Sequence, residues 1–148
     1  MKSKVMYIEN KSYGHHGPAW IGRVEFSKSG QTVYFNDKAL KKLKNTGISG
    51  NHFDIETGEE YWISGVKKNG QDRHMFGGGK IMLDKNSIEE YLKLVDFNHI
   101  DENHFTIIEC LKTDKKRFTA IENAEVEFRH NGFRARYWEN NKRKLLSF

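Results

Sequence analysis

Cysteine, proline and long apolar runs are almost absent from this 148-residue chain, which holds one cysteine and one proline. A single thiol, Cys110, excludes an intramolecular disulfide and a zinc centre built on several cysteines, and it is typical of a reducing compartment. No segment approaches the roughly 20 apolar residues of a membrane helix, and the first residues lack the apolar stretch of a signal peptide. The sequence therefore predicts a cytoplasmic protein without a membrane partner.

Catalytic and cofactor-binding motifs are missing as well. The seven histidines are scattered without the spacing of a zinc site. The glycines before Lys80 are similar to a phosphate loop, but Ile81 stands where that loop needs Ser or Thr. Glu59 and Glu60, as neighbours in a strand, would point to opposite sides and form a poor acid–base pair. We therefore expect no catalytic residues, no metal and no cofactor, and a binding protein rather than an enzyme.

Charge falls into three blocks along the chain. Residues 1–86 contain 14 Lys/Arg against 9 Asp/Glu, residues 87–128 contain 5 against 10, and residues 129–148 contain 6 against 1. The blocks therefore carry +5, −5 and +5, which sum to the net charge of +5. Two basic blocks could bind a polyanion, or they could pair with the acidic block of the same chain.

What the chain does have is aromatic content and alternating hydrophobicity. Aromatic residues make up 13% of the sequence and can supply a core. In residues 19–35, Val24 and Phe26 alternate with Glu25 and a glycine-containing turn follows, which is a strand–turn–strand pattern. This pattern predicts a mainly β fold, either a small antiparallel barrel, for example SH3-like, or a sandwich. Further strands are expected over residues 4–9, 59–66, 71–76, 80–83, 104–111, 117–121, 124–129 and 133–138.

One short helix and a division of the chain are also predicted. Ser87 and Glu90 fit a capping box, and the apolar side chains that follow share one helical face: Ile88, Tyr91, Leu92 and Val95. Residues 36–47 fit either one helical turn or a second hairpin, and the surrounding strands favour the hairpin. We expect a β module over residues 1–96 that ends in the helix. A C-terminal antiparallel β unit over residues 97–148 would follow, either separate or packed as one domain with the first.

Two phrases of the sequence resemble a known family. They are "GPAWIGRVEFSKSGQTVYF" (Gly17–Phe35) and "NHFDIETGEEYWISGVKKNGQDRHMFGGGKIMLD" (Asn51–Asp84). The family consists of short stand-alone bacterial proteins of unknown function, and the resemblance covers about residues 6–95. Its members often bear the label deoxyxylulose-phosphate synthase, but the "GDG" metal motif of that enzyme does not occur here. The resemblance therefore implies a small domain and no activity.

The first candidate site lies around "KKNG" (Lys67–Gly70), because Asn-Gly favours a tight hairpin turn. Such a hairpin would place Asp72 and Arg73 on a strand paired with that of Trp62. An aromatic ring beside Arg and Asp could bind a planar or anionic group by stacking and paired hydrogen bonds. The alternatives are a buried Trp with a surface ion pair, or an enzyme site at these residues.

The second candidate site is the last predicted hairpin, whose first strand repeats the pattern of residues 24–30 at residues 126–132. Alternation places two arginines and a ring on one face, and a basic run follows. These are the residue types that single-stranded nucleic acid binding uses: Arg134, Arg136, Trp138, Lys142 and Arg143. The sequence thus favours a binding module for nucleic acid or another polyanion. The alternative is a protein partner, as for a toxin-neutralising immunity protein or an adaptor, with the acidic segment 87–128 as the contact face.

Overall fold

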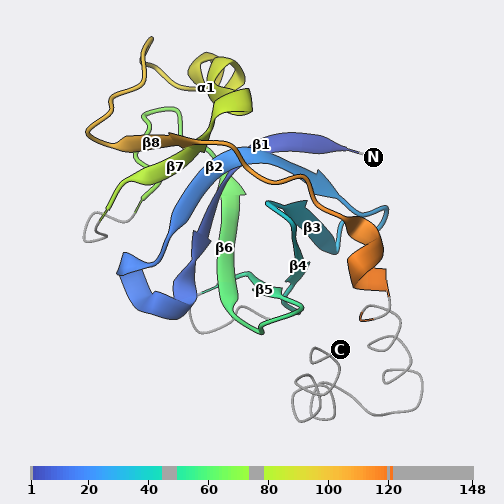
Figure 1. Cartoon of the computed structure of the whole chain (residues 1–148). Coiled ribbons are helices and arrows are strands. Elements are labelled where there is room, and N and C mark those ends of the chain that lie inside the picture. Colours follow the sequence, from blue (N-terminus) through green and yellow to red (C-terminus); the bar gives the residue numbers. More distant parts are fainter. Residues whose placement is uncertain (1, 45–49, 74–78, 120, 122–148) are drawn as a thin grey trace.

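Eight strands form one continuous sheet in the computed structural model, which describes residues 2–44, 50–73, 79–119 and 121 (Figure 1). The order is β1-β6-β5-β4-β3-β2-β7-β8, and an additional β1–β2 pairing closes the first six into an antiparallel barrel. The prediction of a mainly β fold with an antiparallel barrel is therefore confirmed. The strands are β1 Ser3–Asn10, β2 Ala19–Phe26, β3 Thr32–Phe35, β4 Lys38–Lys42, β5 His52–Asp54, β6 Glu60–Gly65, β7 Ile81–Asp84 and β8 Phe105–Ile108.

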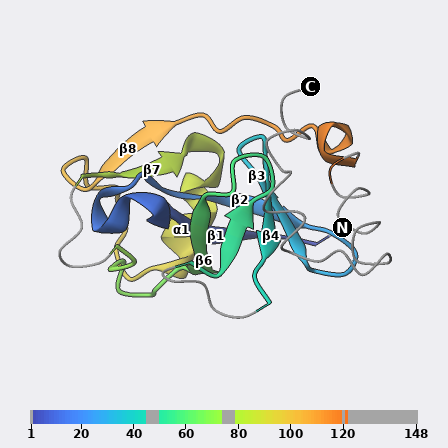
Figure 2. The same ribbon diagram turned by 90° about the horizontal axis from the view of Figure 1, so that it is seen from below.

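Strands β7 and β8 extend the sheet sideways from the barrel (Figure 2). Strand β7 pairs in parallel with β2, and β8 pairs in parallel with β7. The described part of the chain also holds four short helices, of which the last follows β8. None of them is long or apolar enough to cross a membrane. They are η1 Lys11–His16, η2 Lys85–Ser87, α1 Ile88–Leu94 and η3 Lys115–Phe118.

Three apolar clusters hold the fold together. The barrel interior is filled by Trp20, Phe35, Leu40 and their neighbours. A second cluster lies on the outer side of β1 and β2, where β7, β8 and α1 cover it. In the third cluster, Phe118 packs on the outer side of β3 and β4 against Tyr34, Ala39 and Ile55. Residues outside the barrel therefore complete the burial of two of its faces.

Residues that tolerate positive φ lie in the two hairpin turns on either side of β3. Gly30 has φ 75° in the β2–β3 turn, a value that glycine adopts without strain. Between β3 and β4, Asn36 has φ 49° and Asp37 has φ 60°, as a type I′ hairpin requires of both central residues. The ambiguous segment after residue 35 is thus a hairpin, as favoured from the sequence.

Two expected strands are not found where the structure describes the chain. Residues 71–73, the start of the expected 71–76 strand, have no strand structure. Residues 117–118, the start of the expected 117–121 strand, lie in the helix η3. Alternation misled there because the Asp114 carboxylate accepts a hydrogen bond from the backbone N–H of Lys116, at 3.2 Å, and starts a helical turn. The strands expected over 124–129 and 133–138 lie outside the described residues.

The predicted helix exists, but its capping box does not form. Ser87 is the residue before α1 and makes no side-chain capping bond. A capping residue takes the extended conformation. Ser87 instead has φ −110° and ψ 0°, because it is also the last residue of η2, which runs directly into α1. Glu90 instead accepts a hydrogen bond from Arg23. The apolar face is as predicted, with Tyr91 fully buried.

Gly22 of β2 leads to a stability prediction. A Cβ atom at this position would lie 2.7 Å from Cε1 of Phe35, whose ring fills the barrel interior. Gly22→Ala is therefore expected to lower the free energy of unfolding by about 1–3 kcal/mol, measured by urea denaturation. Adding Phe35→Leu should relieve the contact, so the double variant should be more stable than the sum of the two single effects by at least about 0.5 kcal/mol. Simple additivity would contradict the predicted contact.

Candidate functional site

One end of the barrel is basic. The backbone N–H of Phe26 donates to the carbonyl of Lys2, at 3.0 Å, and that of Lys42 donates to the carbonyl of Gln31, at 2.8 Å. These bonds bring together the start of β1, the β2–β3 turn and the end of β4. Five exposed lysines lie on these segments, and none forms an ion pair with another described residue. We call them the basic end: Lys2, Lys4, Lys28, Lys42 and Lys44.

The opposite end of the barrel is acidic. The β5–β6 turn and its flanks hold four carboxylates within seven residues, and the β3–β4 turn adds Asp37. Arg117 bridges two of these turns, because it pairs with Asp37 and, at 2.8 Å, with Glu56. Five carboxylates therefore gather at this end, and Arg117 and the nearby Lys38 offset part of their charge. The four carboxylates are Asp54, Glu56, Glu59 and Glu60.

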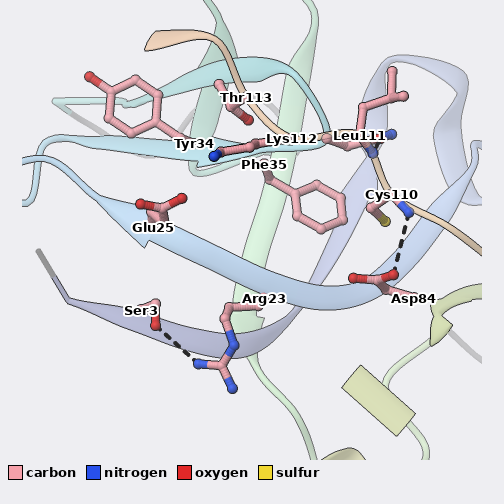
Figure 3. Close-up of a pocket in the computed structure, with 11 residues that line it drawn as sticks. Ser3, Arg23, Glu25, Tyr34, Phe35, Asp84, Cys110, Leu111, Lys112 and Thr113 are labelled. Atoms are coloured by element: carbon pink, nitrogen blue, oxygen red, sulfur yellow. Dashed lines mark hydrogen bonds between the residues drawn. The ribbon is translucent and has the colours of Figure 1, made fainter. Parts of the chain in front are cut away.

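A groove of about 300 Å³ opens where β3 and β7 separate from β2 (Figure 3). Strand β2 pairs with β7 at residues 20–21 and with β3 at residues 25–26. Residues 22–24 between them pair with β1 on one side only, within the described chain. The segment 109–114, which we call the strap, runs along the other side of the groove.

Hydrogen bonds tether the strap to the β3–β4 turn. The backbone N–H of Leu111 donates to Oδ1 of Asn36, at 2.8 Å, and the N–H of Asp37 donates to Oγ1 of Thr113, at 3.0 Å. The strap therefore forms a fixed wall of the groove although it belongs to no strand.

Asp84, at the end of β7, lies at one end of the groove. The residue is only 8% exposed. Its Oδ1 accepts hydrogen bonds from the backbone N–H groups of Cys110, at 3.3 Å, and Asn86, at 3.4 Å. Its second oxygen accepts none from a described residue and turns toward the Phe35 side of the groove (Figure 3). The carboxylate is thus anchored by one oxygen and presents the other.

The expectation that Asp72 and Arg73 lie on a strand paired with that of Trp62 is wrong. Strand β6 pairs with β1 along residues 61–65 and with β5 at residues 60–61, and residues 71–73 form no strand beside it. A turn does form at Lys67–Gly70, since the N–H of Gly70 donates to the carbonyl of Lys67 at 2.9 Å. It is not the predicted Asn-Gly hairpin turn, because Gly70 has positive φ and Asn69 does not. Asp72 then folds back and accepts from the N–H of Lys67, at 2.7 Å.

Arg73 lies beside β1 instead. Its Nη2 donates to the carbonyl of Gly17, at 2.7 Å. The hydroxyl of Tyr7 donates to Glu9, which is 2% exposed and lies directly opposite Trp62 on the neighbouring strand. Burial and the Glu9 carboxylate raise the pKa of Tyr7, while nearby Arg73 acts to lower it. Trp62 and Arg73 thus flank a buried Tyr7–Glu9 pair, an arrangement that fastens the loop after β6 to the barrel.

The residues of the second candidate site fall outside the described part of the chain. This holds for Arg134, Arg136, Trp138, Lys142 and Arg143. The nucleic-acid interface expected at the last hairpin therefore stays a prediction.

Burial shifts the pKa values of two groups that could do chemistry, the Cys110 thiol and the His52 imidazole. Burial, together with the nearby Asp84 charge, raises the pKa of the Cys110 thiol to about 12, so that it is not a thiolate at neutral pH. Burial lowers the pKa of His52 to about 4, with a smaller effect from Lys42. Among residues 2–44, 50–73 and 79–119, no three His, Cys, Asp or Glu side chains converge as a metal site.

Comparisons with models of protein families, with curated proteins and with solved structures found no match. The described chain is defined by its architecture, a closed six-stranded antiparallel barrel with a parallel two-stranded extension. The family resemblance over residues 6–95 stays a prediction.

The sequence did not predict where the basic end and the groove lie. The excess of five positive charges in residues 1–86 was the signal for the first. Only the pairing of β1, β2 and β4 shows that these lysines share one end. For Asp84 no comparable signal exists, because a single aspartate after a strand is common.

Proposed function

We propose that this chain is a non-enzymatic binding protein that engages nucleic acid through the basic end of its barrel. The observation that carries the proposal is the convergence of five exposed lysines from three chain segments, without an ion pair to any described residue. Lysines in such a cluster can neutralise successive phosphates, and release of counterions from the nucleic acid then drives binding.

The five carboxylates at the opposite end of the barrel support one orientation of the nucleic acid. They repel a polyanion, so it would approach the basic end. Among the described residues, the most exposed rings are those of Tyr13 and Trp62. Tyr13 lies in η1, which follows the end of β1 opposite the basic end. Binding at the basic end itself would therefore depend on phosphates rather than on base sequence.

A charge-removal experiment tests this proposal. Lys28, Lys42 and Lys44 are changed together to Gln, and binding to a fluorescent oligothymidylate is measured from 50 to 300 mM salt. If the variant loses three phosphate contacts, the slope of log affinity against log salt should become shallower by about 2. Affinity at low salt should fall at least about tenfold.

The matched control removes three exposed lysines on the β7–α1 side of the molecule. Lys68, Lys80 and Lys93 are changed to Gln, which gives the same net charge. This control should leave the slope within experimental error of the wild-type value. An equal loss in both variants would mean that only net charge matters, and would overturn the assignment of the site.

A protein partner is the second candidate function. The observation in its favour is strand β8, which pairs only with β7 in the described structure and exposes 43% of Ile107. An open strand edge is suited to pairing with a strand of another protein. Charge reversal at Glu102 or Glu109 should weaken such a partner and leave nucleic-acid binding unchanged or stronger.

A further inference from the structure

We propose that the groove between the strap and β2 binds a small organic cation, an alkylguanidinium or alkylammonium group, through the carboxylate of Asp84. This site is separate from the basic end and takes a ligand of opposite charge. Three features of the groove favour such a ligand: the balance of its charges, the backbone of β2 that faces it, and the residues around Asp84.

The other charged groups that line the groove are already compensated or lie far from Asp84. Arg23 donates to Ser3 at 3.0 Å and pairs with Glu90. Glu25 pairs with Lys115, at 2.7 Å. Lys112 is exposed and lies on the Tyr34 side of the groove (Figure 3). Asp84 forms no ion pair with any described residue, so its negative charge dominates its end of the groove.

The backbone of β2 adds an acceptor to the same space. Alternate residues of a strand direct their N–H and C=O groups to the same side. The N–H of Ser27 donates to Thr32 of the β3 side, at 2.9 Å, so odd-numbered residues of this region face β3 and the groove. Arg23 lies in the stretch that pairs with neither β3 nor β7. Its carbonyl and its N–H therefore face the groove, as does the Asp84 oxygen that accepts no hydrogen bond from a described residue.

The surroundings of the carboxylate favour an alkyl cation over other ligands. The ring of Phe35 and the thiol of Cys110 lie beside Asp84 (Figure 3). They offer an uncharged, apolar surface to an alkyl chain. An anion would be repelled by Asp84, and the described residues offer no second and third ligand for a metal ion. A nitrogen cation with several N–H groups can donate to both the carboxylate and the carbonyl.

Amide NMR shifts of the full chain provide the test. Ethylguanidinium chloride should shift the amide signals of Arg23, Cys110 and Leu111 along one saturable curve. The neutral isostere N-ethylurea, at the same concentrations, should not. Asp84→Asn keeps an oxygen to accept from the N–H groups of Cys110 and Asn86 but removes the charge, so it should weaken binding at least tenfold. Glu89→Gln is the matched control, because this exposed carboxylate of α1 does not line the groove, and it should change affinity less than threefold.

A second variant keeps the proposal testable if Asp84→Asn does not fold. Cys110→Leu fills the groove without changing any charge, and it should abolish the saturable shifts. Equal binding of ethylguanidinium and N-ethylurea would overturn the proposal, as would unchanged affinity in a folded Asp84→Asn variant. The lysine variants that test nucleic-acid binding should bind ethylguanidinium like the wild type, so the two proposals can fail separately.

Discussion

Phe118→Ala is expected to lower the free energy of unfolding by about 3–5 kcal/mol. Phe118 is fully buried in the cluster with Tyr34, Ala39 and Ile55. Its ring covers the outer face of β3 and β4, so truncation both exposes that face and leaves a cavity. Urea denaturation of the two proteins, followed by circular dichroism, measures the difference.

Arg117→Ala is the matched control for this prediction. Arg117 is the neighbour of Phe118 and pairs with Asp37 and Glu56, but its side chain is 38% exposed. Exposed ion pairs contribute about 0–1 kcal/mol, and the guanidinium, 4.4 Å from the centre of the Phe118 ring, adds about 0.5–1 kcal/mol. This variant should therefore lose less than about 2 kcal/mol. If Arg117→Ala cost as much as Phe118→Ala, charge rather than burial would hold η3 to the barrel.

The two variants also separate local from global effects. The strap precedes η3 and is tethered to the same β3–β4 turn. Loss of the Phe118 ring should therefore increase hydrogen exchange at the Leu111 amide more than at amides of the barrel interior. Because the strap forms one wall of the groove, Phe118→Ala should also weaken ethylguanidinium binding, whereas binding of nucleic acid at the basic end should be retained.

The local features of the fold could be predicted because neighbouring residues determine them. Alternation around Val24 and Val33, with Gly30 between them, specified the β2–β3 hairpin. Asn36 and Asp37 tolerate positive φ, which decided the next turn in favour of a hairpin. These features depend on backbone preferences within a few residues and need no knowledge of distant contacts.

Barrel closure could not be predicted in this way. It depends on β1 pairing with β6, where Tyr7 faces Ser64, more than 50 residues along the chain. That pairing occupies one edge of β6 along residues 61–65, and the chain after the turn reaches the Gly17 carbonyl through Arg73 instead of forming a strand beside β6. The prediction was therefore right that the chain turns at residues 67–70, and wrong that a strand paired with β6 follows the turn. Alternation gives the two faces of a strand but not its neighbours.

The second prediction with a large expected effect on stability concerns His52, which faces the interior of the barrel. Its imidazole is 8% exposed and lies opposite Lys42 on the neighbouring strand. The amide of Asn51 is oriented by two bonds to Ile63, because Nδ2 donates to its carbonyl and Oδ1 accepts from its N–H. The same Oδ1 lies 2.8 Å from Nδ1 of His52. This nitrogen must therefore carry the proton and donate, which fixes the neutral ring in one tautomer.

Acid should destabilise the protein through this residue. Burial, and to a lesser extent the Lys42 charge, lowers the pKa of His52 from 6.5 to about 4. The unfolded chain takes up a proton there below about pH 6.5, whereas the folded protein does so only near pH 4. The contribution of the neutral, buried His52 ring to the free energy of unfolding is therefore complete above pH 6.5, and it is lost as the pH falls to 4. The loss amounts to about 3 kcal/mol.

His52→Gln measures this effect, because glutamine does not titrate. Urea denaturation of both proteins between pH 4 and 7.5 should show the wild type losing about 3 kcal/mol relative to the variant. Burial raises the pKa of Asp54, which acts in the opposite direction near pH 4. Asp54 is present in both proteins, so its contribution cancels in the difference. Parallel curves would mean that the folded barrel accepts a proton at His52 as readily as the unfolded chain, and that burial does not exclude the charged ring.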